Sequence, residues 1–179
     1  MPRFAALLRG INVGGHKRVA MADLRQLLSG LGFTDVRTLL QSGNAVFSCR
    51  PTKPEALAKR IEGAIRAELG LDVSCLVRSQ EEMRAVIAAN PLGKVATDGS
   101  KLLVVFLSES PASARLAEHD PVDLDPDRIR LGDRVIYQWC PDGILAAPPV
   151  GGFAEKHLSV TTSGRNWNTV TKLGALLDE

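Results

Sequence analysis

Aromatic residues, cysteines and long apolar runs are all scarce in this chain of 179 residues. Aromatics make up only 4% of it, which is few for a surface that stacks nucleic-acid bases. The three cysteines, Cys49, Cys75 and Cys140, form no C-x-x-C pair and are too few for a zinc site, so we expect free core thiols and no metal. No other cofactor is expected. No apolar run approaches the roughly 18 residues that cross a bilayer, and the N-terminal run is too short for a signal peptide. These absences predict a cytoplasmic protein without a membrane partner.

A strong charge of one sign is also missing. The net charge is +2, which excludes the global basic field typical of a dedicated nucleic-acid binder. The halves differ, however: residues 1–90 contain 13 Lys/Arg against 8 Asp/Glu, and residues 91–179 contain 9 against 12. A basic first half beside an acidic second half still allows a local site for an anion.

Strand and helix patterns alternate along the whole chain. Short apolar runs predict strands over residues 4–9, 36–40, 45–49, 73–77, 102–107, 129–131 and 135–139. Helical spacing of apolar residues predicts helices over 21–31, 52–69, 79–90 and 110–119 and a last helix from 167. The first six elements follow the β-α-β-β-α-β order of the ferredoxin-like unit. The second half repeats this order but lacks the final strand.

These patterns predict an α+β fold of duplicated ferredoxin-like halves. We expect the first half over residues 1–78, a connecting helix and hinge over 79–100, and the second half over 101–179. Halves of this size bury little apolar surface alone, so we expect them to pack as one compact body with a groove at the seam.

A glycine-rich loop follows the first strand and carries several cations. Glycines allow backbone N–H groups to turn toward an anion, and Arg9, Lys17 and Arg18, with His16, would supply charge. The sequence GINVGGHK resembles a P-loop but has His16 where that motif has Lys. The alternative is a flexible loop with solvated charges. The candidate binding residues here are Arg9, Asn12, Gly14, Gly15, His16 and Lys17.

Two other polar segments are candidates for the same site. In the turn Gln41-Ser42-Gly43-Asn44, Ser42 and Asn44 offer a hydroxyl and an amide, although a turn needs no function. Around the start of the last helix stand Arg165, Asn166, Trp167 and Asn168. A helix N-terminus attracts anions, which Arg165 would reinforce. Capping alone would explain one polar side chain there, and Trp167 also suits core packing.

No catalytic set is evident. The histidines, His16, His119 and His157, have no ordered nucleophile or acid beside them in sequence, and neither G-x-S-x-G nor H-E-x-x-H occurs. The acidic string of Asp123, Asp125 and Asp127 lacks the glycine and glutamate of a calcium loop and is typical of a solvated loop.

Three motifs together resemble one family. LRGINVGG (residues 8–15), QSGN (41–44) and RNWNTV (165–170), in this order and spacing, are similar to the bacterial family called domain of unknown function 1697. The resemblance implies a duplicated α+β fold with ferredoxin-like halves, and it links the three polar segments as hallmarks. It implies no reaction.

The sequence therefore predicts a protein that binds an anionic or phosphorylated small molecule. Arg9, Lys17 and Arg165 would neutralise charge, and Asn12, Asn44 and Asn166 would orient the ligand. A nucleic-acid-binding module is the alternative, since RNA-recognition domains share the ferredoxin-like order, but Phe47 is the only aromatic of its predicted strand. An enzyme acting on the bound ligand is a third hypothesis, for which no base or nucleophile can be named.

Overall fold

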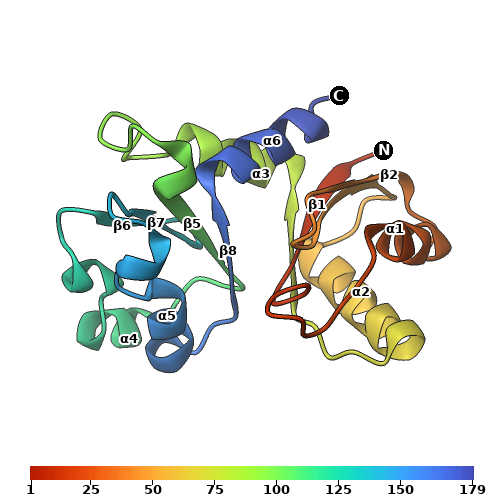
Figure 1. Cartoon of the computed structure of the whole chain (residues 1–179), viewed down its shortest axis with the longest axis horizontal. Helices are drawn as coiled ribbons and strands as arrows, with labels where there is room; N and C mark the ends of the chain where they lie inside the picture. Colours follow the sequence, from red (N-terminus) through yellow and green to blue (C-terminus); the bar gives the residue numbers. More distant parts are fainter. The chain divides into compact units, whose positions relative to one another are not determined.

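The computed structural model describes residues 1–179, which form two four-stranded antiparallel sheets and six α-helices (Figure 1). The strands are β1 (Arg3–Leu8), β2 (Thr34–Leu39), β3 (Asn44–Ser48), β4 (Cys75–Ser79), β5 (Leu102–Leu107), β6 (Ile129–Gly132), β7 (Val135–Trp139) and β8 (Thr162–Asn166). The helices are α1 (Met21–Gly30), α2 (Pro54–Leu69), α3 (Gln80–Ala88), α4 (Ser113–Glu118), α5 (Val150–Leu158) and α6 (Trp167–Leu177). The predicted α+β class is confirmed at this level.

Contacts divide the chain into two compact units. The first unit comprises residues 1–84 and 173–179, and the second comprises residues 85–172. The sheet of the first unit has the order β2-β3-β1-β4, and that of the second has the order β6-β7-β5-β8.

The core of the first unit lies between its sheet and helices α1 and α2 (Figure 1). Alternate residues of the strands point to this side, because successive side chains of a strand face opposite ways. Three phenylalanines form the aromatic part of the core: Phe33 stacks on Phe47 at 4.3 Å and Phe4 on Phe47 at 5.8 Å between ring centroids. All three are buried. Strand β1, which leads into the glycine-rich loop, is therefore held by its two neighbouring strands and by the helices packed on the sheet.

Local signals set several helix boundaries. A capping box starts α3: Ser79 N–H donates to Glu82 Oε1 at 3.0 Å, and Glu82 N–H donates to Ser79 Oγ at 3.1 Å. The sequence predicts that α2 begins at residue 52, but its N-cap is Lys53, because Pro54 occupies the first helical position. Gly70, at φ 66°, ends α2 in the left-handed conformation.

The second unit corrects the prediction that the second half lacks its last strand. Residues 162–166 form β8, which pairs with β5 from Leu107↔Thr162 to Leu103↔Asn166. Its sequence, TSGRN, has no alternation of apolar residues, so no local pattern indicates a strand. It is a strand because the apolar strand β5 offers a free edge along its whole length.

Helix α5 is also absent from the sequence prediction. It begins after Pro149 and contains Gly151 and Gly152, which are poor helix formers. Its buried residues, Val150, Ala154 and Leu158, stand four apart and pack into the core of the second unit. Tertiary burial of this stripe outweighs the weak propensity.

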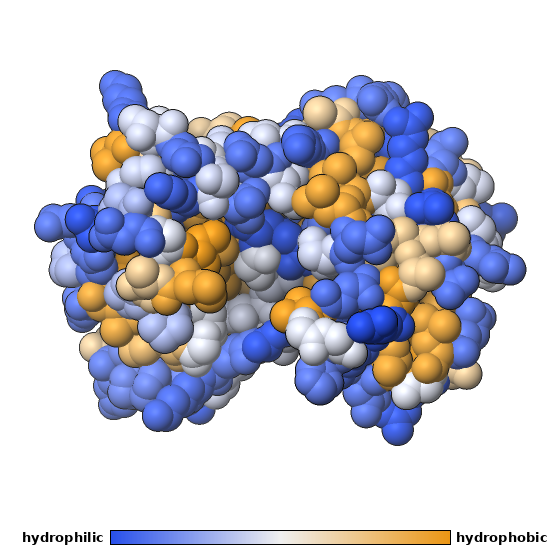
Figure 2. All heavy atoms as spheres, in the orientation of Figure 1, coloured by the Kyte–Doolittle hydropathy of each residue, from blue (hydrophilic) through white to orange (hydrophobic).

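The surface mixes polar and apolar residues. Figure 2 shows apolar patches among polar and charged residues on the face drawn. The exposed large apolar side chains include Val13 and Leu40 in the first unit and Leu145 in the second. The longest helix, α2, has 16 residues, and no helix has the length and apolar character to traverse a bilayer.

Candidate functional site

The glycine-rich loop after β1 folds as a narrow hairpin in the first unit. Its two ends are anchored by Ile11 and Val19, which are buried in the core. Asn12 N–H donates to Lys17 O at 3.1 Å, and His16 N–H donates to Val13 O at 3.1 Å. The tip consists of Gly14 and Gly15, both at positive φ (60° and 77°), as the two central residues of a type I′ turn require. These two glycines thus shape the turn.

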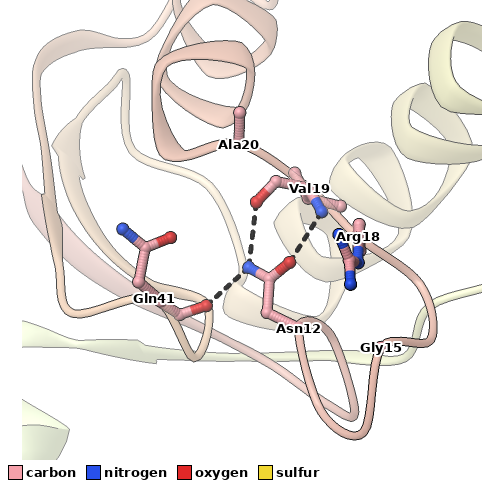
Figure 3. A pocket seen from close by; sticks show the side chains of 6 residues that line it. All are labelled: Asn12, Gly15, Arg18, Val19, Ala20 and Gln41. Carbon is pink, nitrogen blue, oxygen red and sulfur yellow. Dashed lines mark hydrogen bonds between the residues drawn. The ribbon is translucent and has the colours of Figure 1, made fainter.

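The side chain of Asn12 holds this loop in place by hydrogen bonds of both its amide nitrogen and its amide oxygen. Its Nδ2 donates to Val19 O at 2.9 Å and to Gln41 O at 2.6 Å, and its Oδ1 accepts from Val19 N–H at 2.8 Å (Figure 3). Its own φ is 57°, a conformation that asparagine adopts more readily than most residues. The side chain closes the base of the loop and ties it to the turn between β2 and β3.

A cavity of about 450 Å³ opens beside this hydrogen-bonded centre. We call it the loop pocket, and its lining residues are Asn12, Gly15, Arg18, Val19, Ala20 and Gln41 (Figure 3). A guanidinium nitrogen of Arg18 lies 3.7 Å from the point where a Cβ on Gly15 would stand, so the cation sits over the glycine turn. The volume is within the range of small-molecule sites.

Helix α1 begins at the wall of the loop pocket. Its N-cap, Ala20, lines the pocket and provides no side-chain hydrogen bond. The first N–H groups of a helix have no partner within the helix, so those of Met21 and Ala22 remain available. Asp23 in this first turn is the one acidic residue there. Arg18 and the helix start together make this wall electropositive.

The other cations predicted for the site do not line the loop pocket. Lys17 Nζ donates to Asp72 O at 2.6 Å and so holds the loop to the segment before β4. The backbone N–H of Arg9 donates to Ser74 O at 2.9 Å. Arg9, His16 and Lys17 are exposed. The charges of Arg9 and Lys17 add to the field of the loop.

The predicted turn residues Ser42 and Asn44 lie in the same unit. Asn44 is fully buried, and its Nδ2 donates to Leu39 O at 3.0 Å and to Ser42 Oγ at 3.1 Å. Its amide therefore closes the turn between β2 and β3. The turn meets the loop through Asn12 and Gln41, so the structure does bring these two sequence motifs together.

The third motif lies in the second unit. Arg165, in β8, donates from Nη1 to Ser163 Oγ at 3.0 Å and to Gly164 O at 2.8 Å. Asn166 Oδ1 accepts from Thr169 N–H at 2.9 Å and caps α6. Trp167, half-buried, is the first residue of that helix, and Asn168 is exposed beside Gly99. That these residues share a site with the glycine loop stays a prediction.

Part of the pocket wall is not evident from the sequence. Gln41, Val19 and Ala20 lie outside the predicted binding residues, and the sequence marks Arg18 only as one of several cations in the loop. The available signal for Gln41 was its place as the first residue of the QSGN motif. Nothing local indicates that Val19 and Ala20 would line a cavity, because that depends on the path of the loop.

Two histidines stack in the second unit. The ring centroids of His119 and His157 are 4.4 Å apart at 24°, and the Phe153 ring is 4.7 Å from that of His157. Nitrogen lone pairs lie in the ring planes, so two nearly parallel imidazoles do not converge on one metal ion. Groups of three or more His, Cys, Asp or Glu side chains suited to a metal are absent from the structure. Burial, followed by the proximity of His119 and Lys156, lowers the pKa of His157.

We expect acidification to destabilise the protein through His157. Because its folded pKa lies below the ordinary value of 6.5, the unfolded chain binds the proton more readily. The folded protein therefore has its full stability above the pKa that His157 has in the unfolded chain, and it loses stability as the pH falls through the lower pKa of the folded state. Between about pH 7.5 and about pH 5, the melting temperature of the wild type should therefore fall more steeply than that of a His157→Gln protein. Equal slopes would contradict this assignment.

The chain is thus an α+β protein with two antiparallel sheets and a loop pocket in its first unit. The family model described as "Protein of unknown function (DUF1697)" matches residues 1–137. The chain belongs to this family, which confirms the resemblance seen in its motifs. The match includes the glycine loop and the QSGN turn.

Among solved structures, the chain is similar to the conserved bacterial protein SP0830 from Streptococcus pneumoniae. The identity is 25%, the TM-score is 0.68, and the match covers 98% of each chain. No curated protein matches the chain significantly.

Proposed function

We propose that this protein binds an anionic or phosphorylated small molecule in the loop pocket. The observation that carries the proposal is the exposed guanidinium of Arg18 at the wall of a cavity of about 450 Å³. Arg18 forms no hydrogen bond or ion pair with another residue, so its donors are available to a ligand. Arginine matches the geometry of phosphate and carboxylate oxygens.

The backbone around Arg18 supports binding of an anion. The glycine turn brings main-chain groups close to the cation, and the start of α1 adds N–H groups and the positive end of the helix dipole. Such a dipole contributes roughly 0.3–1 kcal/mol to an anion at its N-terminus, and a charged hydrogen bond contributes about 1.5–3 kcal/mol. Since Asn12 holds the loop in place, little ordering is required when the ligand binds.

A small ligand is favoured over a nucleic acid by the placement of the aromatic rings. RNA-recognition domains stack bases on aromatic side chains exposed on their sheet. Here Phe4 and Phe33 both stack on Phe47 in the core of the first unit. A shallow salt dependence with single-stranded RNA would agree with this choice, because a series of phosphate contacts gives a steep one.

Arg18→Ala is expected to weaken binding of inorganic phosphate at least about tenfold, since a charged hydrogen-bond donor is lost. Asp23→Asn should strengthen binding two- to fivefold, roughly, because it removes a negative charge from the first turn of α1. Isothermal titration calorimetry measures both effects. Arg50→Ala, which removes an exposed arginine that does not line the pocket, is the matched control and should change nothing. Unchanged binding by the Arg18→Ala protein would refute the proposal.

We also infer that the chain consists of two ferredoxin-like halves related by duplication, residues 1–78 and 101–179, joined through 79–100. Both sheets are built from the succession β-α-β-β-α-β, and both have the neighbour order second, third, first, fourth. This is the arrangement of the split β-α-β unit.

A further inference from the structure

We propose that Gln41 determines ligand specificity in the loop pocket by binding a paired donor and acceptor at the far end of the ligand from its phosphate. This inference rests on the proposed function. In Figure 3 the side chains of Gln41 and Arg18 stand on opposite sides of the Asn12 amide. Two recognition groups separated in this way suit a ligand with two different ends.

The wall offers one neutral polar side chain to such a ligand. Both Nδ2 hydrogens of Asn12 are engaged by Val19 O and Gln41 O, and its Oδ1 accepts from Val19 N–H. Gln41 uses only its backbone carbonyl in that network. Its side-chain amide is exposed and forms no hydrogen bond with the protein. The carboxamide is thus presented from a backbone position that Asn12 holds still.

The chemistry of the carboxamide defines the matching group. It offers a donor and an acceptor side by side, which pair with an acceptor and a donor on an amide or on the edge of adenine. The remaining wall includes the apolar side chains of Val19 and Ala20, and the volume of about 450 Å³ suits a small organic molecule. The ligand class that fits is a phosphomonoester carrying an amide-like edge, and adenosine 5′-monophosphate is a probe of that class.

Calorimetric titrations with three probes test this assignment: inorganic phosphate, ribose 5-phosphate and adenosine 5′-monophosphate. We expect the wild type to bind the nucleotide most tightly. Gln41→Leu should weaken nucleotide binding about tenfold, the effect of losing two hydrogen bonds, and should leave binding of the other two probes unchanged. Gln26→Leu, the same change at an exposed glutamine of α1 outside the pocket wall, should have no effect on any probe.

The outcomes separate the two proposals. If phosphate binds in an Arg18-dependent manner but the Gln41→Leu protein binds the nucleotide as tightly as the wild type, the specificity role is overturned and the anion site stands. The specificity role of Gln41 is also overturned, and the anion site again stands, if the nucleotide binds no tighter than ribose 5-phosphate. If none of the three probes binds to the wild type, the proposed function itself fails. Thermal melting of each variant checks that it is folded.

Discussion

A Gly43→Ala protein should lose about 2–5 kcal/mol of unfolding free energy, which combines a left-handed backbone penalty with overpacking. Gly43 has a φ of 87°, and a Cβ there would lie 2.7 Å from the Cβ of Leu8 and 2.9 Å from Cδ1 of Ile11. Both neighbours are buried in the core. Neither the backbone angle nor the space permits a side chain, so the turn must shift. Urea denaturation measures the loss as a lower midpoint.

Gly63 provides the matched control because it lies in α2, where a Cβ would meet nothing within 4 Å. Replacing this exposed glycine by alanine should stabilise the protein by about 0.5–1 kcal/mol, since alanine is the better helix former. The two Gly→Ala changes are therefore expected to have opposite signs. Similar changes in midpoint for both would show that the contacts of Gly43 with Leu8 and Ile11 are not important for stability.

An Asn12→Ala protein should lose about 2–4 kcal/mol of unfolding free energy, the sum expected for three hydrogen bonds. It should also lose phosphate binding in the loop pocket. The three bonds join Asn12 to Val19 and Gln41, so without them the loop separates from the turn that forms the opposite wall. Amide hydrogen exchange at Val19, whose N–H donates to Asn12 Oδ1, reports this opening directly. Denaturation and phosphate calorimetry complete the measurement.

Two further substitutions distinguish the causes of this loss. Asn12→Gly keeps the positive φ of 57° without strain. The stability of this variant should therefore lie between that of the wild type and that of Asn12→Ala. Asn12→Asp has nearly the same shape but places an acceptor against the carbonyl oxygens of Val19 and Gln41, and it should be at least as damaging as alanine. If the aspartate variant retains full protection at Val19, the amide bonds do not hold the loop.

The sequence predicted the first unit more accurately than the second. Strands β1 and β3 are apolar and buried, and its helices carry clear apolar stripes, as with Leu57, Ile61 and Ile65 in α2, so local periodicity and tertiary burial agree there. In the second unit, β8 has no apolar pattern and α5 contains two glycines. These elements depend on partners distant in sequence, which a local window does not contain.

The candidate site shows the same division. The glycines at the loop tip and the cations beside them were evident from residue type, because positive φ and charge are properties of single residues. The hydrogen bonds of the asparagines within the protein were not evident: Asn12, Asn44 and Asn166 are predicted to orient a ligand, and in the structure each also forms a hydrogen bond within its own unit. An amide forms the same hydrogen bonds with a ligand as with a backbone carbonyl, so its partner depends on what the fold places within 3 Å.

Residue order alone therefore predicted the α+β class, the family, and a glycine-rich loop with cations after the first strand. The class follows from periodicity, the family from the resemblance of three motifs, and the loop from the conformational preference and charge of single residues. Tertiary structure decided that β8 completes the second sheet and that the side chain of Asn12 holds the loop by hydrogen bonds. It also decided that the side chains of Arg18 and Gln41 are exposed at the wall of the loop pocket. These outcomes depend on contacts such as that between Asn12 and Gln41, 29 residues apart, which form only when the chain has folded.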